Sequence, residues 1–271
     1  MIMEEAIMRL GFIGCGNMAT AMMKGIIENQ ILDNGQIIGS DVSETSIEKA
    51  KNTLGITVTN DNKKVVEESE IIVLSIKPQY YESVISEIKN SVKADQIIVT
   101  IAPGKTLEWL GNQFGNNVKI VRTMPNTPAL VGAGITAVCY NDNVDDDELE
   151  QVVTLLKGFG KCEIIPESLM DVVVSVSSSS PAYVFMFIEA MADAAVADGM
   201  PRDKAYEFAA QAVLGSAKMV LDTGKHPGEL KDMVCSPAGT TIEAVRVLEE
   251  KGMRSAVIEA MKACTRKAKG M

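Results

Sequence analysis

The stretch Met8–Ala21 reads MRLGFIGCGNMATA and decides the fold of the first half of the chain. A short apolar run that ends at Ile13 predicts a buried strand, and apolar residues at helical spacing after it predict a helix. Between them, Gly14, Gly16 and Ala19 follow the order G-x-G-x-x-A. In this setting the first glycine permits a tight turn, the second lets a pyrophosphate approach the backbone, and the small third residue lets the helix pack closely. The stretch therefore predicts a dinucleotide-binding turn at a helix N-terminus, and the alternative is a glycine-rich turn without a ligand.

Composition narrows the class of protein. The chain has 271 residues, of which 46% are hydrophobic and 23% charged, as in ordinary globular proteins. The net charge of -10 and an aromatic content of 4% argue against nucleic-acid and anionic-membrane partners. Five widely spaced cysteines without a C-x-x-C pair predict neither a disulfide framework nor a zinc site, and favour a cytoplasmic location. With a single histidine, His226, we expect no metal site.

Membrane and export signals are also not expected. The N-terminal sequence MIMEEAIM is acidic and too short for a signal peptide. No uninterrupted apolar run reaches the roughly 18 residues that a membrane span needs.

The first part of the chain alternates short apolar runs with amphipathic segments, which predicts an α/β fold with a doubly wound, Rossmann-type sheet. We assign residues 1–165 to a dinucleotide-binding domain. Its predicted helices are 43–54, 62–68, 80–88, 106–110 and 145–157. Its predicted strands end at residues 13, 40, 58, 76, 101, 122 and 140, with 56–58 and 134–140 as edge strands.

Residues 166–271 predict an all-helical second domain, because the strand pattern stops near residue 165. Ser180 and Pro181 have the residue types of an N-cap and a first helical position. From residue 185 to 197 only Glu189 and Asp193 interrupt an apolar sequence, so we expect a helix that is buried on all sides. A domain of this size does not bury such a helix alone, which predicts a partner subunit. Further helices are expected at 202–221, 228–234, 241–251 and 254–268.

Three segments after predicted strands are candidates for ligand contact. Asp41 follows the second strand, where an acidic residue commonly binds the adenosine ribose and disfavours a 2′-phosphate; the alternative is a solvent-facing turn residue. Pro78 ends the 71–76 strand and leaves backbone groups free for a ribose or nicotinamide. The sequence RTMPNTP, residues 122–128, predicts a rigid loop over the cleft in which Asn126 offers a donor and an acceptor.

The sequence CSPAGTTIE, residues 235–243, predicts a second anion site. Thr240 and Glu243 fit a capping box at a helix start, which places Thr241 at the first helical position with a free hydroxyl. The backbone N–H groups there suit an anionic substrate, and the alternative is an ordinary helix cap.

Taken together, these motifs resemble those of the pyrroline-5-carboxylate reductases, enzymes of proline biosynthesis. The matching pieces are FIGCGNMA (12–19), SIKPQ (75–79), RTMPNTP (122–128), SSPAYVF (179–185), HPGELKD (226–232) and SPAGTTIEA (236–244). The resemblance implies a Rossmann domain followed by a helical dimerisation domain. It also implies a homodimer or a larger assembly of dimers, in which the active site forms between the Rossmann domain of one subunit and the helical domain of its partner.

The resemblance also implies the site residues. Substrate contacts carry over to Ser236, Thr240 and Thr241, with Thr241 as the catalytic residue. Four positions depart from the family pattern. Ser178, Ser180 and Ala238 stand where the family usually has glycine, and Asp41 stands where many members carry a basic residue suited to NADP. The expected cofactor contacts, with Asp41 and Asn126 added from the residue patterns, are Ile13, Gly14, Cys15, Gly16, Asn17, Met18, Ser40, Asp41, Asn62, Ser75, Ile76, Lys77, Pro78, Ile101, Ala102 and Asn126.

The implied reaction is hydride transfer from NADPH or NADH to the C=N carbon of 1-pyrroline-5-carboxylate. A protonated imine is already a strong electrophile, so the protein needs to supply no acid. Its task is to hold the carboxylate, orient the ring and offer the Thr241 oxygen to the N–H.

Two alternatives remain at this point. One is a β-hydroxyacid dehydrogenase, although the first long helix lacks the lysine that this chemistry uses. The other is a non-catalytic dinucleotide sensor.

Overall fold

The computed structural model describes residues 9–270. The predicted absence of a signal peptide concerns residues 1–8, which lie outside this range. Contacts divide the chain into two compact units, one that ends at Ser178 and takes in the chain again from Thr265, and one that spans Ser179–Cys264. The predicted boundary at residue 165 instead marks the point where the last strand ends and helices begin.

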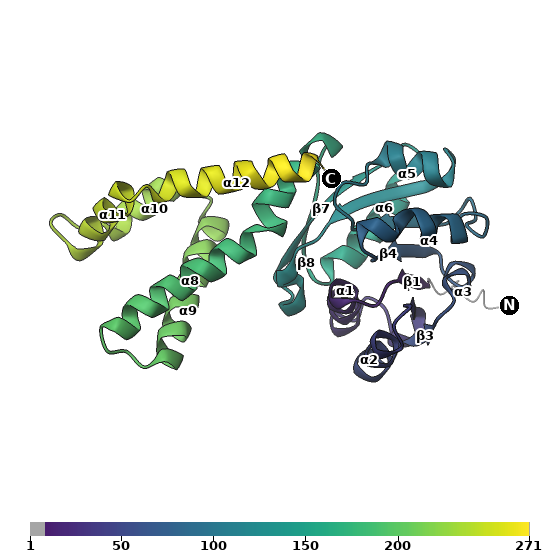
Figure 1. Ribbon diagram of the computed structural model, residues 1–271, viewed down its shortest axis with the longest axis horizontal. Helices are drawn as coiled ribbons and strands as arrows, with labels where there is room; N and C mark the ends of the chain where they lie inside the picture. The colour runs from purple at the N-terminus through teal and green to yellow at the C-terminus, as the bar shows by residue number, and fades with distance from the viewer. Residues whose placement is uncertain (1–8, 271) are drawn as a thin grey trace. The chain divides into compact units, whose positions relative to one another are not determined.

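The first unit contains an eight-stranded sheet in the order β3-β2-β1-β4-β5-β6-β7-β8 (Figure 1). All neighbouring strands are parallel except β6 and β7. The order reverses at β1, as in a doubly wound nucleotide-binding sheet, so the α/β fold class is confirmed. The strands are β1 (Leu10–Ile13), β2 (Ile37–Ser40), β3 (Thr57–Thr59), β4 (Ile71–Leu74), β5 (Ile97–Thr100), β6 (Lys119–Met124), β7 (Gly134–Tyr140) and β8 (Gly160–Ile164).

Helices cover both faces of this sheet, as parallel strands require. On one face, Phe12 of β1 packs in a cluster with Met22 and Phe159. On the other, Ile13 packs in a cluster with Ile72 and Tyr81. Successive residues of β1 therefore point to opposite sides and both sides are buried, which explains the unbroken apolar runs of the sequence. The helices are α1 (Asn17–Glu28), α2 (Glu44–Leu54), α3 (Asn62–Glu67), α4 (Tyr81–Ile88), α5 (Leu107–Phe114) and α6 (Asp146–Lys157).

The far edge of the sheet differs from the prediction. β7 is not an edge strand, because β8 pairs with it from Gly134–Gly160 to Val138–Ile164. The sequence of β8, GKCEI, has no apolar run like those of the buried strands, and its alternation of polar and apolar residues covers only the minimum length that indicates a strand. Two glycines permit the pairing: a Cβ on Gly160 would lie 2.1 Å from the carbonyl oxygen of Gly134. β3 lies at the opposite edge, as predicted for 56–58.

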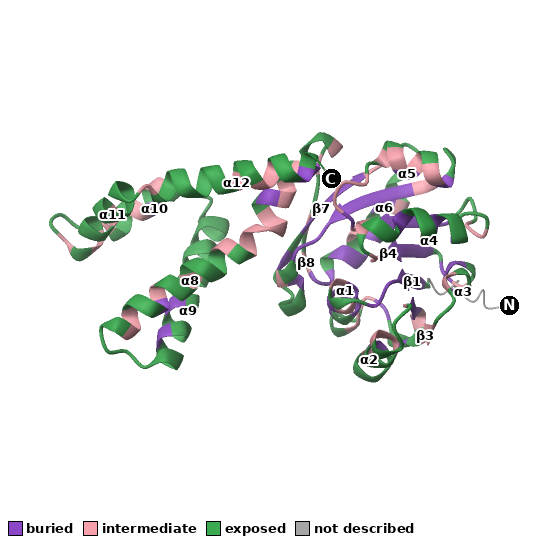
Figure 2. Ribbon diagram, viewed as in Figure 1, coloured by how far each residue is buried: buried purple, intermediate pink, exposed green. Residues whose placement is uncertain are grey.

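The second unit is helical, with α8 (Ser180–Ala197), α9 (Arg202–Thr223), α10 (Pro227–Val234), α11 (Thr240–Glu250) and the start of α12 (Met253–Lys269). Its helices are mostly exposed (Figure 2). Four side chains in the unit are buried, those of Ala192, Ala205, Ala209 and Leu230. Large apolar side chains such as Phe185 and Phe208 are exposed by 63% and 65%. The unit therefore has almost no hydrophobic core of its own, and the expectation that its first long helix is buried on all sides does not hold within a single chain.

The start of that long helix also differs from the prediction. Ser180 is not an N-cap, because α7 (Met170–Val173) and a π-helical turn (Val174–Ser178) lead directly into α8. Since the preceding residues are already helical, there is no free helix start for Ser180 to cap. The helical segment Glu167–Ala197 is long and apolar enough, by length and composition alone, to cross a membrane. A helix in the core of a soluble protein also has this length and composition, so these two properties do not distinguish a membrane from a protein interior.

We expect Gly160→Ala to lower the free energy of unfolding by about 2–4 kcal/mol, because Gly160 has a φ of +148° and the added Cβ would overlap the Gly134 backbone. Gly35→Ala is the matched control, since a Cβ there meets nothing within 4 Å. Urea unfolding of both variants measures the difference. Equal stability of the two variants would show that β7 and β8 do not approach as closely as described.

Candidate functional site

The glycine-rich turn after β1 is held from both neighbouring strands. The N–H of Gly14 donates to the carbonyl oxygen of Ser40 at 2.7 Å, and the Ser75 hydroxyl donates to the carbonyl oxygen of Gly14 at 2.6 Å. Gly14 has a φ of +100°, and a Cβ on it would lie 2.6 Å from the Ser75 carbonyl oxygen. A Cβ on Gly16, by contrast, would meet nothing within 4 Å. The turn is therefore rigid at Gly14 and open at Gly16, where a ligand has room to approach.

Helix α1 begins directly after this turn without a side-chain cap. Gly16 is its N-cap and supplies no side chain, so the first N–H groups of the helix lack the usual partner. Helices α2, α3, α5 and α6 of the same unit all begin with a side-chain cap, from Ser43, Asp61, Thr106 and Asp145. The uncapped start of α1 suits an anion such as a pyrophosphate.

Asp41 supports this turn rather than facing solvent freely. Its Oδ2 accepts the N–H of Cys15 at 2.8 Å, and its Oδ1 accepts the N–H of Ser43 at 2.9 Å. Asp41 thus ties the end of β2 to the glycine-rich turn and brings a negative charge beside it. Burial, with a smaller contribution from Asp41, raises the pKa of the Cys15 thiol to about 12. The thiol therefore stays protonated near neutral pH and is not a nucleophile.

The other predicted cofactor residues of the first unit leave the sheet at the same edge. Ile13 pairs with both Ser40 and Leu74, and Leu74 pairs with Thr100. Since these strands are parallel, the segments that follow them emerge together. The first turn of α1 adds Asn17 and Met18. The segments are 75–78, with an exposed Lys77, and the pair Ile101 and Ala102.

Asn62 reaches the same edge from α3. It accepts the hydroxyl of Ser40 at 2.7 Å, and its own Nδ2 donates to Glu87 of α4 at 2.9 Å. Sequence patterns did not single out Glu87. Glu87 lies 25 residues from Asn62, and no motif spacing joins the two.

Asn126 has a structural role in this unit. Its Nδ2 donates to the carbonyl oxygen of Ser177 at 3.0 Å, and its Oδ1 accepts the N–H of Ile135 at 2.9 Å. Its side chain is therefore held on both sides by backbone groups. Each end of the amide can still form one more hydrogen bond, so the cofactor contact of Asn126 stays a prediction. Arg122 likewise lies within β6 rather than in a loop, and it pairs with Glu167 at 2.7 Å.

The predicted substrate residues lie at the start of α11, in the second unit. The capping box is wrong: the N-cap is Gly239, not Thr240, and no side chain caps the helix. Thr240 is the first helical residue and Thr241 the second. Glu243 instead pairs with Arg246 of the next turn. Helix α11 therefore begins as α1 does, with a glycine N-cap and first N–H groups that no side chain satisfies.

The turn before α11 carries a strained residue. The N–H of Gly239 donates to the carbonyl oxygen of Ser236 at 3.1 Å and closes a turn with Pro237 and Ala238 at its centre. Ala238 has a φ of +58°, in the left-handed region that favours glycine. A proline followed by a positive φ is the pattern of a type II turn. The alanine is therefore accommodated where this turn prefers a glycine.

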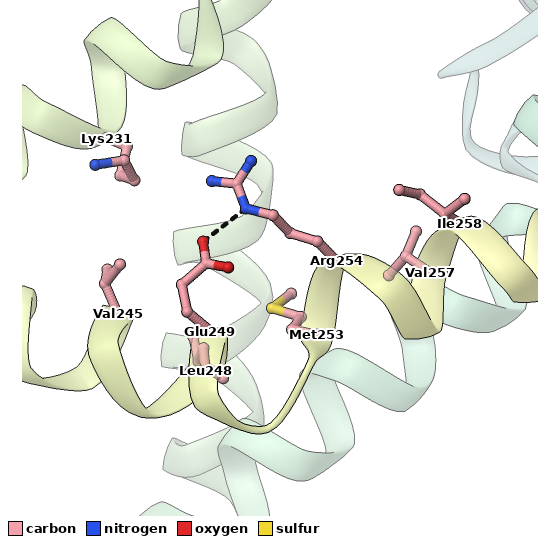
Figure 3. Close-up of a pocket in the computed structure, with 8 residues that line it drawn as sticks. All are labelled: Lys231, Val245, Leu248, Glu249, Met253, Arg254, Val257 and Ile258. Atoms are coloured by element: carbon pink, nitrogen blue, oxygen red, sulfur yellow. Dashed lines mark hydrogen bonds and ion pairs between the residues drawn. The ribbon is translucent and has the colours of Figure 1, made fainter.

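A separate hollow of about 470 Å³ lies between α10, α11 and α12 (Figure 3). Leu248, Met253, Val257 and Ile258 give it an apolar lining, and Arg254 pairs with Glu249 at 2.6 Å at one side. Its apolar character suits a protein side chain better than a small polar substrate. Within residues 9–270, no group of three or more His, Cys, Asp or Glu side chains is arranged to hold a metal ion.

Comparisons with known proteins identify the family. The family described as "Pyrroline-5-carboxylate reductase dimerisation" matches residues 167–271, and "NADP oxidoreductase coenzyme F420-dependent" matches residues 9–104. The pyrroline-5-carboxylate reductase of Escherichia coli is 52% identical over 260 residues, which cover 96% of this chain and 97% of that protein. The chain belongs to the pyrroline-5-carboxylate reductase family. Its enzyme class is therefore that of the NAD(P)H-dependent oxidoreductases.

Solved structures of the pyrroline-5-carboxylate reductase family agree with this fold. The enzyme from Coxiella burnetii superposes with a TM-score of 0.89 at 32% identity, covering 97% of this chain and 98% of that one. The enzyme from Plasmodium falciparum, determined with NADP bound, also has a TM-score of 0.89, at 31% identity and 97% coverage of both chains. The resemblance drawn from the sequence motifs is confirmed.

We expect Ala238→Gly to raise the free energy of unfolding by about 0.5–1 kcal/mol, because glycine adopts the positive φ without steric cost. Ala244→Gly is the control, since the same change inside α11 lowers stability by about 1 kcal/mol. Thermal or urea unfolding of both variants checks the opposite signs. A stability loss in Ala238→Gly would contradict the strained turn.

Gly14 and Gly16 of the glycine-rich turn should respond differently to substitution by alanine. Gly14→Ala should destabilise the fold, because its Cβ overlaps the Ser75 backbone. Gly16→Ala should keep the free energy of unfolding within about 1 kcal/mol yet weaken NADH and NADPH binding by about tenfold or more, since the methyl group occupies the approach of the pyrophosphate. Unfolding and nucleotide titration of both variants test this. Unchanged nucleotide affinity in Gly16→Ala would exclude the turn as the pyrophosphate site.

Proposed function

We propose that this protein reduces 1-pyrroline-5-carboxylate to L-proline by hydride transfer from NADPH or NADH, as the names of its relatives indicate for them. The observation that supports the proposal is that α1 and α11 both begin after a glycine N-cap and lack a side-chain cap. A helix start without a side-chain cap binds anions through its free N–H groups and its dipole. The proposed reaction has two anionic partners, a dinucleotide and an imino acid. Each helix start takes one of them.

In this proposal the dinucleotide binds at the open edge of the sheet in the first unit. The pyrophosphate lies over Gly16 and the start of α1, and the adenosine ribose lies toward Asp41 and Asn62. The nicotinamide lies toward the segments after β4 and β5, which include Pro78 and Ala102. The remaining proposed contacts of the cofactor are Ile13, Gly14, Cys15, Asn17, Met18, Ser40, Ser75, Ile76, Lys77, Ile101 and Asn126.

The substrate carboxylate takes the N–H groups at the start of α11, with Ser236 and Thr240 beside it. The Thr241 hydroxyl accepts the N–H of the bound imine. When bound, the cofactor supplies the hydride, and the protein contributes position and electrostatic stabilisation. The imine binds protonated and the amine product keeps that proton, so no acid or base of the protein enters the step.

We further propose that the working unit is a homodimer or a larger assembly built from dimers. The exposed apolar surface of the second unit needs a cover, and residues 167–271 match a dimerisation family. A second copy of the chain covers α8 and α9 and fills the apolar hollow of Figure 3. In this arrangement the α11 start of one subunit completes the nucleotide site of its partner.

The residue chemistry also supports two finer proposals. The negative charge of Asp41 beside the ribose end disfavours a 2′-phosphate, so we propose a preference for NADH over NADPH. All five cysteines are free, which suits a reducing compartment, and we propose that the protein is cytoplasmic.

The assay mixes the protein with 1-pyrroline-5-carboxylate and either nicotinamide and follows the loss of reduced-nicotinamide absorbance. Turnover supports the proposal, and the ratio of kcat/KM with NADH to that with NADPH measures the preference. Oxidation of a β-hydroxy acid in place of imine reduction would indicate a β-hydroxyacid dehydrogenase. Nucleotide binding without turnover of either substrate would indicate a sensor.

Thr241→Ala should lower kcat/KM for the imine. The loss should correspond to about 1–3 kcal/mol of activation free energy, the scale of a hydrogen bond to a charged group. Ser255→Ala, which removes an exposed hydroxyl from α12, should leave the rate unchanged. Steady-state kinetics measures kcat/KM of the two variants, and thermal unfolding checks that both are folded. Wild-type kinetics in Thr241→Ala would remove this hydroxyl from the mechanism.

A further inference from the structure

A directed chain of hydrogen bonds runs from the end of β2 to α4. The Ser40 hydroxyl donates to Oδ1 of Asn62 at 2.7 Å, and Nδ2 of Asn62 donates to Oε2 of Glu87 at 2.9 Å. Ser40 is fully buried, Asn62 is half-buried and Glu87 is exposed. The chain therefore leads from the core of the sheet to its surface through a single amide group.

Glu87 decides the direction of this chain. An ionised carboxylate only accepts hydrogen bonds, whereas an asparagine amide offers an acceptor on one side and donors on the other. The NH₂ group of Asn62 must therefore face Glu87, and its oxygen must face Ser40. Without Glu87, the Ser40 hydroxyl would satisfy either orientation, because it both donates and accepts.

Packing of α4 on α3 does not depend on this hydrogen bond. Val65 and Val66 of α3 and Ile85 and Ile88 of α4 are buried to within 1% of their surface and belong to one apolar cluster. A single exposed hydrogen bond adds little to such a contact. What the carboxylate controls is the orientation of the Asn62 amide.

Asn62 is linked to the glycine-rich turn through two hydrogen bonds, both of them made by Ser40. The carbonyl oxygen of Ser40 accepts a hydrogen bond from the N–H of Gly14 at 2.7 Å, and the hydroxyl of Ser40 donates to Asn62. With one N–H of the amide on Glu87, the second N–H remains as a donor at the ribose end of the proposed nucleotide site. A ribose hydroxyl oxygen is a matching acceptor.

We propose that Glu87 is a positioning residue for the nicotinamide cofactor, which fixes the Asn62 amide with an N–H directed to the adenosine ribose. This inference rests on the proposed nucleotide site. Glu87 contacts neither cofactor nor substrate in this role, so its removal affects cofactor binding and leaves the hydride step unchanged.

The test compares Glu87→Ala with Glu87→Gln. The alanine variant should bind NADH and NADPH about fivefold more weakly, the scale of one hydrogen bond, with an unchanged kcat. The glutamine variant retains an acceptor oxygen and should restore most of the affinity. Glu82→Ala is the matched control, because Glu82 is an exposed carboxylate of the same helix that forms no hydrogen bond or ion pair within residues 9–270, and it should leave affinity unchanged.

A double-mutant cycle with Asn62→Ala separates positioning from charge. If Glu87 acts through the amide, Glu87→Ala should add nothing to Asn62→Ala. A further affinity change in the double variant, or equal effects of Glu82→Ala and Glu87→Ala, would overturn the proposal in favour of long-range electrostatics. Wild-type affinity in Glu87→Ala would overturn it as well.

Binding is measured by direct nucleotide titration, independent of turnover. Failure of the wild-type protein to bind either nucleotide would therefore count against the proposed function. Normal binding by the wild type together with normal binding by Glu87→Ala would count against the role of Glu87 alone.

Discussion

Helices α1 and α11 each begin after a glycine N-cap and lack a side-chain cap, and the proposed chemistry depends on this shared feature. Most helices in the sheet-containing unit satisfy their first N–H groups with a serine, threonine or aspartate side chain. The first N–H groups of α1 and α11 have no such side-chain partner, and in the function that we propose they bind ligands. In that proposal, the same backbone geometry binds a dinucleotide in one unit and a small carboxylate in the other. No ionisable side chain would then be required at the reacting atoms, because the imine would carry its own proton.

The rest of the first unit keeps the α1 start in position. Ser40, Asp41 and Ser75 each contribute a hydrogen bond to the backbone of the turn between Gly14 and Cys15. These residues come from the ends of β2 and β4, which lie on the two sides of β1. A turn held from both neighbours does not need to rearrange when the ligand binds, so less ordering entropy is lost on binding.

The second unit, in contrast, lacks a hydrophobic core of its own and is incomplete as a single chain. Its buried side chains are three alanines and one leucine, while phenylalanine, methionine and leucine side chains are exposed. Such a surface is stable in water only when it is covered. Residues 167–271 match a family described as a dimerisation family, which agrees with this composition. The apolar segment Glu167–Ala197 contributes to the same exposed surface.

The sequence by itself determined the α/β class, the glycine-rich turn, most strands and the family, because unbroken apolar runs and local motifs carry that information. It missed β8, whose pairing depends on the close approach of Gly134 and Gly160 and not on hydrophobicity. It also placed a cap on Thr240, and it did not show the backbone contacts of Asn126, since residue types do not reveal which backbone groups a side chain meets. Only the tertiary structure decided these points, together with the contact of Glu87 with Asn62, because they join residues whose sequence separation leaves no local pattern.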